Sequence, residues 1–292
     1  MTYNLWQLPL VSQDRKVRLE KLIPRIQELQ PDILAFQELW TRTYKKRLAQ
    51  DLKELGYQVY FESPSSGLGL KGLLGNGLFI ASRYPMRIPS EHLLAFREYT
   101  APEEIMAAKG ALHVEVELPN IGWSDLYNTH LGAVRYDKKA GIFNEKDAQA
   151  NMEQGIELAH WIKNTAAHPF QILSGDFNVH HQSFDSRSGQ FSDSPSPLHQ
   201  LFTQGILSFA DVFHLLNGWE NSERSYSRDN AYVAKGLFAN DPDCFFDFVY
   251  ASPHPQVNPL SAKLILKEDL PETKRPLSDH YALLVDFDVR NP

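Results

Sequence analysis

Short β-strands that end in polar residues constrain the fold of this chain most. Residues 33–36 (Ile-Leu-Ala-Phe) form a continuous apolar run, and such a short run fits a strand buried on both faces. Many strands with few helices predict two packed sheets with helices outside, in one domain over residues 1–292. The other predicted strands are residues 58–61, 78–82, 111–118, 126–131, 170–173, 245–250, 262–267 and 281–287.

Three helices are predicted to flank these strands. The first follows residue 14 and contains Pro24, where a kink or a break is expected because proline lacks the amide donor. The second ends at Gly56, and the third spans residues 146–163. Residues 182–197 are rich in Ser, Asp and Pro and are predicted to form a loop.

Composition narrows the class of protein. The 292 residues carry a formal net charge of −7, which disfavours nucleic acid as a partner unless a local basic patch overrides it. The single cysteine, Cys244, excludes an intramolecular disulfide and a thiolate zinc cluster. No apolar run approaches the roughly 18 residues of a spanning helix. We expect a monomer.

The beginning of the chain resembles the end of a strand, and no signal peptide is visible. We therefore suspect that an upstream piece was removed. The sequence does not fix the compartment, although a secreted or extracytoplasmic location is slightly favoured over a cytoplasmic one.

Polar residues that can bind metals or titrate recur where apolar strands end. Ligand sites of layered α/β proteins lie at strand ends, so we expect these side chains to converge. Carboxylates, amides and imidazoles together suit a hard cation and phosphate chemistry. The residues are Asn4, Glu38, His130, Asp176 with Asn178, and Asp279 with His280.

Each of these segments also has a purely structural interpretation. Asn4 fits a turn, Glu38 a charge at a helix start, and His130 a satisfied histidine at a strand end. Residues 176–178 fit an Asx turn, and residues 278–280 fit a helix cap with a surface histidine. Asp247 differs, because an aspartate between apolar strand residues is costly to bury unless it is paired. We interpret it as the partner of a histidine.

The order and spacing of the motifs resemble the endonuclease/exonuclease/phosphatase superfamily and, within it, the neutral sphingomyelinases. The resemblance runs from Asn4 to about Phe287. The chain departs from the sphingomyelinase pattern at Glu104, where an Asp is usual, and at Gly132, where a polar residue is usual. The matching segments are residues 4–6 (Asn-Leu-Trp), 36–40 (Phe-Gln-Glu-Leu-Trp), 81–85, 109–110 (Lys-Gly), 129–131 (Thr-His-Leu), 175–180 (Gly-Asp-Phe-Asn-Val-His), 230–233, 246–250 and 276–283.

This resemblance implies a DNase I-like four-layer α/β sandwich, in which two mixed sheets pack face to face between helices. It implies an Mg²⁺ ion, or Mn²⁺ or Ca²⁺, on Glu38 with Asn4 beside it, and Asp279 orienting its neighbours or joining a second metal. His280 would be the general base held by Asp247.

The remaining roles concern the phosphoryl group. Asp176 and Asn178 would position the water and the phosphoryl group. His130 would stabilise the pentavalent charge or assist the leaving group. Lys109 would contact phosphate, unless it is merely a solvated lysine before a strand.

The predicted reaction is the hydrolysis of sphingomyelin, or a related choline phospholipid, to release phosphocholine. The alternatives are an exo- or endonuclease, a phosphoinositide or sugar-phosphate phosphatase, and a binding protein with a degenerate site. Exposed leucines in a glycine-rich loop, together with Trp219, would suit peripheral membrane contact, unless the loop buries them. These leucines are Leu68, Leu70, Leu73 and Leu74.

Overall fold

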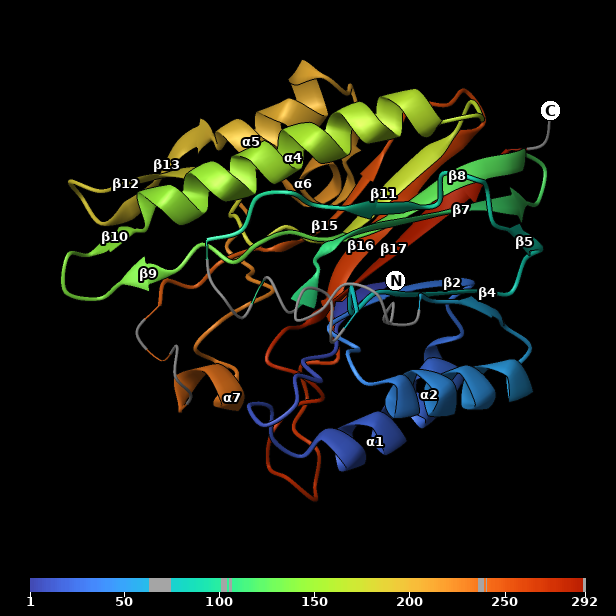
Figure 1. Cartoon of the computed structure of the whole chain (residues 1–292), viewed down its shortest axis with the longest axis horizontal. Helices are drawn as coiled ribbons and strands as arrows, with labels where there is room; N and C mark the ends of the chain where they lie inside the picture. Colours follow the sequence, from blue (N-terminus) through green and yellow to red (C-terminus); the bar gives the residue numbers. More distant parts are fainter. Residues whose placement is uncertain (63–74, 101–103, 105–106, 236–238, 240, 291–292) are drawn as a thin grey trace.

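The computed structural model describes residues 1–62, 75–100, 104, 107–235, 239 and 241–290. The chain forms two mixed sheets that lie between two groups of helices (Figure 1). The four loop leucines at positions 68, 70, 73 and 74 lie outside the described residues.

The first sheet has the strand order β16-β17-β1-β2-β4-β3. Strands β1 and β2 are parallel, and the other pairs are antiparallel. The strands are β1 (Thr2–Asn4), β2 (Ile33–Gln37), β3 (Gln58–Tyr60), β4 (Phe79–Ser82), β16 (Val257–Ile265) and β17 (Ala282–Val289).

The second sheet has the order β14-β15-β11-β8-β7-β5, with β6 also paired to β7. Only β8 and β11 run parallel in it. The strands are β5 (Met86–Arg87), β6 (Leu93–Ala95), β7 (Gly110–Leu118), β8 (Gly122–His130), β11 (Gln171–Asp176), β14 (Ala210–Asp211) and β15 (Asp247–Ala251).

The helices cover the outer faces of the two sheets (Figure 1). Helices α1 (Arg15–Leu29) and α2 (Arg42–Glu54) pack on the first sheet through a cluster that includes Leu22, Leu52 and Phe36. The second sheet is covered by α4 (Glu145–Thr165), α5 (Pro197–Gln200), the π-helix η1 (Leu201–Gly205) and α6 (Val212–Asn217). The short helix α7 (Ala231–Ala234) lies apart from these layers. The predicted four-layer sandwich is therefore confirmed.

Two local predictions differ from the structure. Helix α1 continues through Pro24, so the expected break is absent, while a kink there stays a prediction; Pro24 lies on the exposed face, where water can satisfy the carbonyl that loses its partner. The predicted loop at 182–197 contains the hairpin of β12 (Gln182–Asp185) and β13 (Gln190–Pro195). Phe184 and Phe191 pair across this hairpin, with ring centroids 5.3 Å apart, and they contact Phe143.

Phe143 belongs to a second small hairpin, formed by β9 (Tyr136–Asp137) and β10 (Ile142–Phe143). The two hairpins share an aromatic cluster that stabilises both. No helix in the described part of the chain is long and apolar enough to cross a membrane.

Candidate active site

The predicted site residues meet where the two sheets present the ends of neighbouring strands. In the second sheet, Asp176 is in register with His130 on one side and with Asp247 on the other. In the first sheet, Asn4 is in register with Gln37, so Glu38 follows directly at the same edge. Long-range strand pairing thus brings residues from distant parts of the sequence to one place.

Sharp turns directly after the strands orient several of these side chains. Trp6, Glu38 and Asn178 have φ values of 45°, 57° and 53°, a region that residues other than glycine rarely adopt. The Asn4 Oδ1 accepts a hydrogen bond from the Trp6 amide (2.9 Å), and the Asp176 Oδ1 accepts one from the Asn178 amide (2.9 Å). Asn4 and Asp176 are therefore both turn residues and site residues, so the two interpretations of each are compatible.

Gly175 allows β11 to approach β8 closely enough to place Asp176. Its φ is +150°, and a Cβ atom there would lie 2.0 Å from the Thr129 carbonyl oxygen. A side chain at this position would force the two strands apart.

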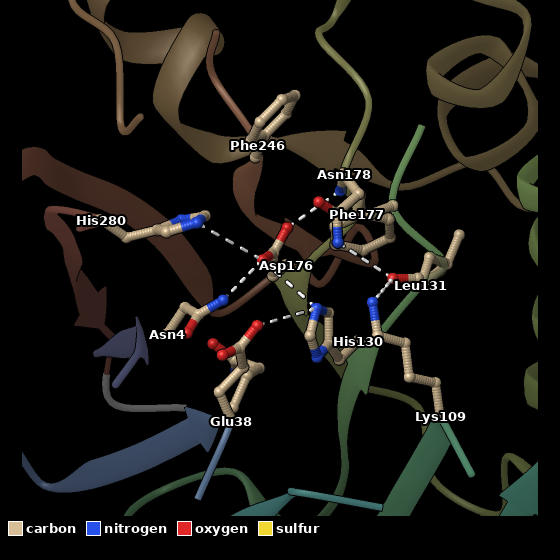
Figure 2. Close-up of polar contacts among 12 residues, drawn as sticks. Asn4, Glu38, Lys109, His130, Leu131, Asp176, Phe177, Asn178, Phe246 and His280 are labelled. Carbon is tan, nitrogen blue, oxygen red and sulfur yellow. Dashed lines mark hydrogen bonds and ion pairs between the residues drawn. The ribbon is translucent and has the colours of Figure 1, made fainter. Parts of the chain in front are cut away.

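His280 and Asp247 form the buried pair that the sequence predicted. The Nδ1 atom of His280 lies 2.8 Å from Asp247 Oδ2, and its Nε2 lies 3.8 Å from Asp176 Oδ2 (Figure 2 shows the latter contact). Burial opposes the charged imidazolium, but the Asp247 and Asp176 carboxylates outweigh it and raise the pKa of His280 to about 10. Asp247 fixes the tautomer by accepting from Nδ1, so Nε2 faces the site.

Asp176 is the centre of the polar network (Figure 2). Its Oδ2 accepts a hydrogen bond from the Asn4 amide nitrogen (2.8 Å) and lies 3.5 Å from His130 Nε2. His130 Nε2 is also 3.9 Å from Glu38 Oε1. Burial, with nearby Lys109 and His280, holds the pKa of His130 well below its usual value, which favours the neutral imidazole.

The carboxylates of the site fit a divalent cation. Burial raises the pKa of Glu38, and it raises the pKa values of Asp176 and Asp279 to about 6 each. The Oε2 atom of Glu38 is buried and makes no hydrogen bond within the described residues. Desolvated carboxylates, of which Glu38 keeps an unused oxygen, are the hard oxygen donors that Mg²⁺ prefers.

A second grouping is less suitable for a metal. Ligand atoms of Asp176, Asp247 and His280 lie within 4.8 Å of one another. Because Asp247 and His280 are already bonded to each other, Glu38, with its unused oxygen, is the better candidate ligand.

Lys109 is buried and paired rather than solvated. Its Nζ donates to Glu104 Oε1 (2.9 Å) and to the Leu131 carbonyl (3.0 Å). The side-chain amide of Asn178 donates to the same carbonyl (2.9 Å), so Lys109 and Asn178 are held by one oxygen (Figure 2). The alternative of a solvated lysine is therefore wrong, and Lys109 is fixed at the wall of the site.

The two departures from the sphingomyelinase pattern lie in contact with each other. A Cβ atom on Gly132 would lie 2.8 Å from Glu104 Oε2. Glu104 is one methylene longer than the usual Asp, and the missing side chain at Gly132 leaves the space that the longer residue occupies. The longer Glu104 therefore fits beside Gly132, and it forms an ion pair with Lys109.

Several supporting residues were not predicted as part of the site. The Ser225 hydroxyl accepts hydrogen bonds from the amides of Phe246 (2.9 Å) and Asp247 (3.2 Å), and the Tyr226 ring lies 5.2 Å from the His280 ring. Both belong to an irregular polar segment in which the sequence carries no periodic signal. Asn230, in a segment quoted for the resemblance, donates to the Ser278 carbonyl (2.7 Å) and so holds residues 278–280.

Trp219 lies in the turn after α6 and is half-buried. Its indole nitrogen donates to the Asp193 carbonyl (3.0 Å), and its ring packs 4.7 Å from that of the buried His181. Membrane contact through Trp219 stays a prediction.

Carboxylates, an amide and a histidine–aspartate pair lie at the edge of these two packed sheets. Such a combination defines a class of hydrolytic sites that can bind a metal ion. The chain belongs to the Endonuclease/Exonuclease/phosphatase family, whose sequence model matches residues 1–280.

Individual relatives show how far the similarity extends. A Drosophila melanogaster protein, whose name places it among the neutral sphingomyelinases, is 25% identical over 291 residues; the match covers 97% of this chain and 59% of that protein. Sphingomyelin phosphodiesterase 2 of Rattus norvegicus is 26% identical over 182 residues, with 61% of this chain and 40% of that protein covered. The chain thus spans only part of the length of these relatives.

The fold is shared with solved structures. TDP2 of D. rerio, crystallised with a single-strand DNA product, superposes with a TM-score of 0.70 at 18% identity, covering 99% of this chain and 97% of that one. This similarity supports the DNase I-like fold.

Proposed function

We propose that this chain is a divalent-metal-dependent phosphodiesterase that hydrolyses sphingomyelin, or a closely related choline phospholipid, and releases phosphocholine. The observation that carries the proposal is the buried His280–Asp247 pair, which faces Asp176 beside Glu38 and Asn4. This arrangement supplies a base, a water-positioning carboxylate and a set of metal ligands within one site.

In the proposed reaction His280 Nε2 takes a proton from a water molecule that attacks phosphorus. Asp247 holds Nδ1 and stabilises the imidazolium that forms. Asp176, fixed by Asn4 and by the Asn178 amide, orients the water. His130 donates to the phosphoryl oxygen or to the leaving group, and Lys109, paired with Glu104, lies at the wall of the site.

Glu38 and Asn4, with Asp279 as a further ligand, would hold a Mg²⁺ ion (or Mn²⁺ or Ca²⁺) that polarises the phosphoryl oxygens and neutralises negative charge. His280 is a base only when it is neutral. The positive charge of a metal ion held at Glu38 would lower the raised pKa of His280.

The substrate proposal rests on the sphingomyelinase relatives and on the pairing of two basic residues, Arg135 and Lys138, with acidic partners. Arg135 binds Asp147 through two hydrogen bonds of 2.7 and 2.9 Å, and Lys138 lies 4.0 Å from Asp241. These acidic partners offset the positive charge of Arg135 and Lys138. The two residues are therefore a weak substitute for the basic cluster that a phosphoinositide phosphatase would need. A nuclease remains the second candidate because a relative in fold was crystallised with a DNA product.

A substrate panel under Mg²⁺ tests the proposal. It compares sphingomyelin, lysophosphatidylcholine, phosphatidylcholine, DNA and a phosphoinositide, each with and without excess chelator. We expect sphingomyelin to be cleaved fastest and the chelator to abolish activity. Preferential cleavage of DNA would favour the nuclease, and inactivity on every substrate would favour the binding protein.

A variant pair tests the site itself. His280→Ala should lower turnover by roughly 10²–10⁴-fold because it removes the proposed base. The exposed His160 on α4 offers a matched control, and His160→Ala should leave turnover unchanged. Near-normal turnover in His280→Ala would refute the assignment.

A further inference from the structure

An exposed apolar turn lies between β1 and α1. Leu8 and Ser12 close it, because both the amide and the hydroxyl of Ser12 donate to the Leu8 carbonyl, at 3.1 and 2.6 Å. Leu10 at its tip is fully exposed (104%) with a φ of +67°, and the adjacent Val11 is 44% exposed. The backbone at Leu10 is strained, and its apolar side chain is held in solvent. A loop that only connects β1 to α1 requires neither feature.

The turn borders a pocket whose wall includes one candidate metal ligand of the active site. The pocket has a volume of about 80 Å³, and its wall includes Val11, Trp6, Tyr226 and Asp279. Asp279 is a candidate metal ligand, and the Tyr226 ring lies 5.2 Å from the His280 ring. In Figure 1 the dark blue segment before α1 lies close to α7, whose residues Ala231, Tyr232 and Val233 form the opposite wall.

Aromatic and basic side chains surround the same pocket. The rings of Trp6 and Tyr232 lie 5.0 Å apart, and the guanidinium of Arg275 stacks over Tyr232 at 5.2 Å. Arg275 is also 3.6 Å from Asp14, so part of its charge is compensated, while Lys235 adds a second cation to the wall. An apolar tip beside amphipathic rings and cations complements a phospholipid surface, where acyl chains lie below a layer of phosphates.

We propose that residues 8–12 are the membrane-contact element of this protein. Leu10 and Val11 enter the boundary between head groups and acyl chains, and the basic and aromatic wall meets the phosphate layer. The pocket then leads a lipid head group toward Asp279 and His280. This inference rests on the proposed phospholipid substrate, and it assigns the membrane contact to residues 8–12.

The test uses the full chain and vesicles of sphingomyelin and phosphatidylcholine. Leu10→Asp should weaken co-sedimentation with vesicles by roughly 10- to 100-fold, because it puts a charge where the proposal inserts an apolar side chain into the membrane. The ratio of vesicle hydrolysis to hydrolysis of the soluble diester bis(p-nitrophenyl) phosphate should fall by a similar factor. Leu260→Asp is the matched control, since Leu260 is 68% exposed on edge strand β16, away from the site, and this variant should match the wild type.

The outcomes separate this inference from the proposed function. If the wild type binds and cleaves the vesicles but Leu10→Asp does so equally well, or Leu260→Asp loses as much, the membrane-contact assignment is wrong. If the wild type does not bind vesicles at all, the assignment is also wrong. If the wild type binds vesicles through Leu10 but cleaves neither lipid nor soluble diester, the contact stands and the proposed function fails.

Two further measurements complete the test. Thermal unfolding followed by circular dichroism shows whether Leu10→Asp folds, and Leu10→Trp, which keeps an interfacial side chain, should retain vesicle binding. Sedimentation of the protein alone reveals whether Leu10 instead contacts a second copy. A wild-type dimer that becomes monomeric in Leu10→Asp would overturn the lipid assignment.

Discussion

Replacing Asp247 by Asn tests the pair on which the proposed chemistry depends. The change keeps the shape of the side chain but removes the carboxylate 2.8 Å from His280 Nδ1. At an effective dielectric constant of about 20, two unit charges at this distance attract by about 6 kcal/mol. Because the Asn still offers a hydrogen-bond acceptor and the site relaxes, we expect a net loss of about 3–5 kcal/mol, as for other broken buried pairs.

If the whole loss falls on the transition state, turnover decreases by roughly two to nearly four orders of magnitude. The assay is hydrolysis of sphingomyelin vesicles and of bis(p-nitrophenyl) phosphate, combined with an NMR titration of His280, whose pKa should fall in the variant. Asp243→Asn is the matched control, because Asp243 pairs with the exposed Arg228 (3.0 Å) outside the site. Wild-type turnover in Asp247→Asn, or an equal loss in Asp243→Asn, would refute the reasoning.

Three further predictions address metal binding, packing and pH. Glu38→Gln should weaken Mg²⁺ binding at least tenfold by isothermal titration calorimetry, whereas the exposed Glu54→Gln should not; equal affinities would remove Glu38 from the metal site. Gly175→Ala should lower the free energy of unfolding by more than about 2 kcal/mol in urea, because its Cβ would overlap a backbone carbonyl of β8 and its φ is +150°; an unchanged midpoint would contradict this. Burial lowers the pKa of His199 to about 4, so its contribution to stability is present above the unfolded pKa of about 6.5 and is lost as the pH falls toward 4. We measure by urea unfolding how much His199→Gln lowers the free energy of unfolding. This destabilisation should shrink by about 1 kcal/mol between pH 7.5 and pH 5.5. A destabilisation that does not change with pH would show that His199 does not resist protonation.

Local patterns in the sequence predicted much of the scaffold. The apolar runs and helical stripes predicted most strands and the three longer helices, because burial on one or two faces leaves a periodic signal. The cost of burying Asp247 predicted a histidine partner, and His280 is that partner.

Other elements were beyond local reasoning. The 182–195 hairpin exists because Phe184 meets Phe191 and Phe143, and the polar residues between these rings conceal the pattern. Helix α1 passes Pro24 because that residue happens to face solvent, which the position of a proline in a sequence does not reveal.

The sequence by itself determined which residue types stand at the ends of the strands, and in which order. Only the tertiary structure decided that Asn4, Asp176 and His280 share one site, that Glu104 fits because Gly132 has no side chain, and that Ser225 and Tyr226 support the base. The physical reason is that periodicity reports burial over neighbouring residues. Distances between segments that lie far apart in the sequence depend on strand pairing and on the packing of two sheets.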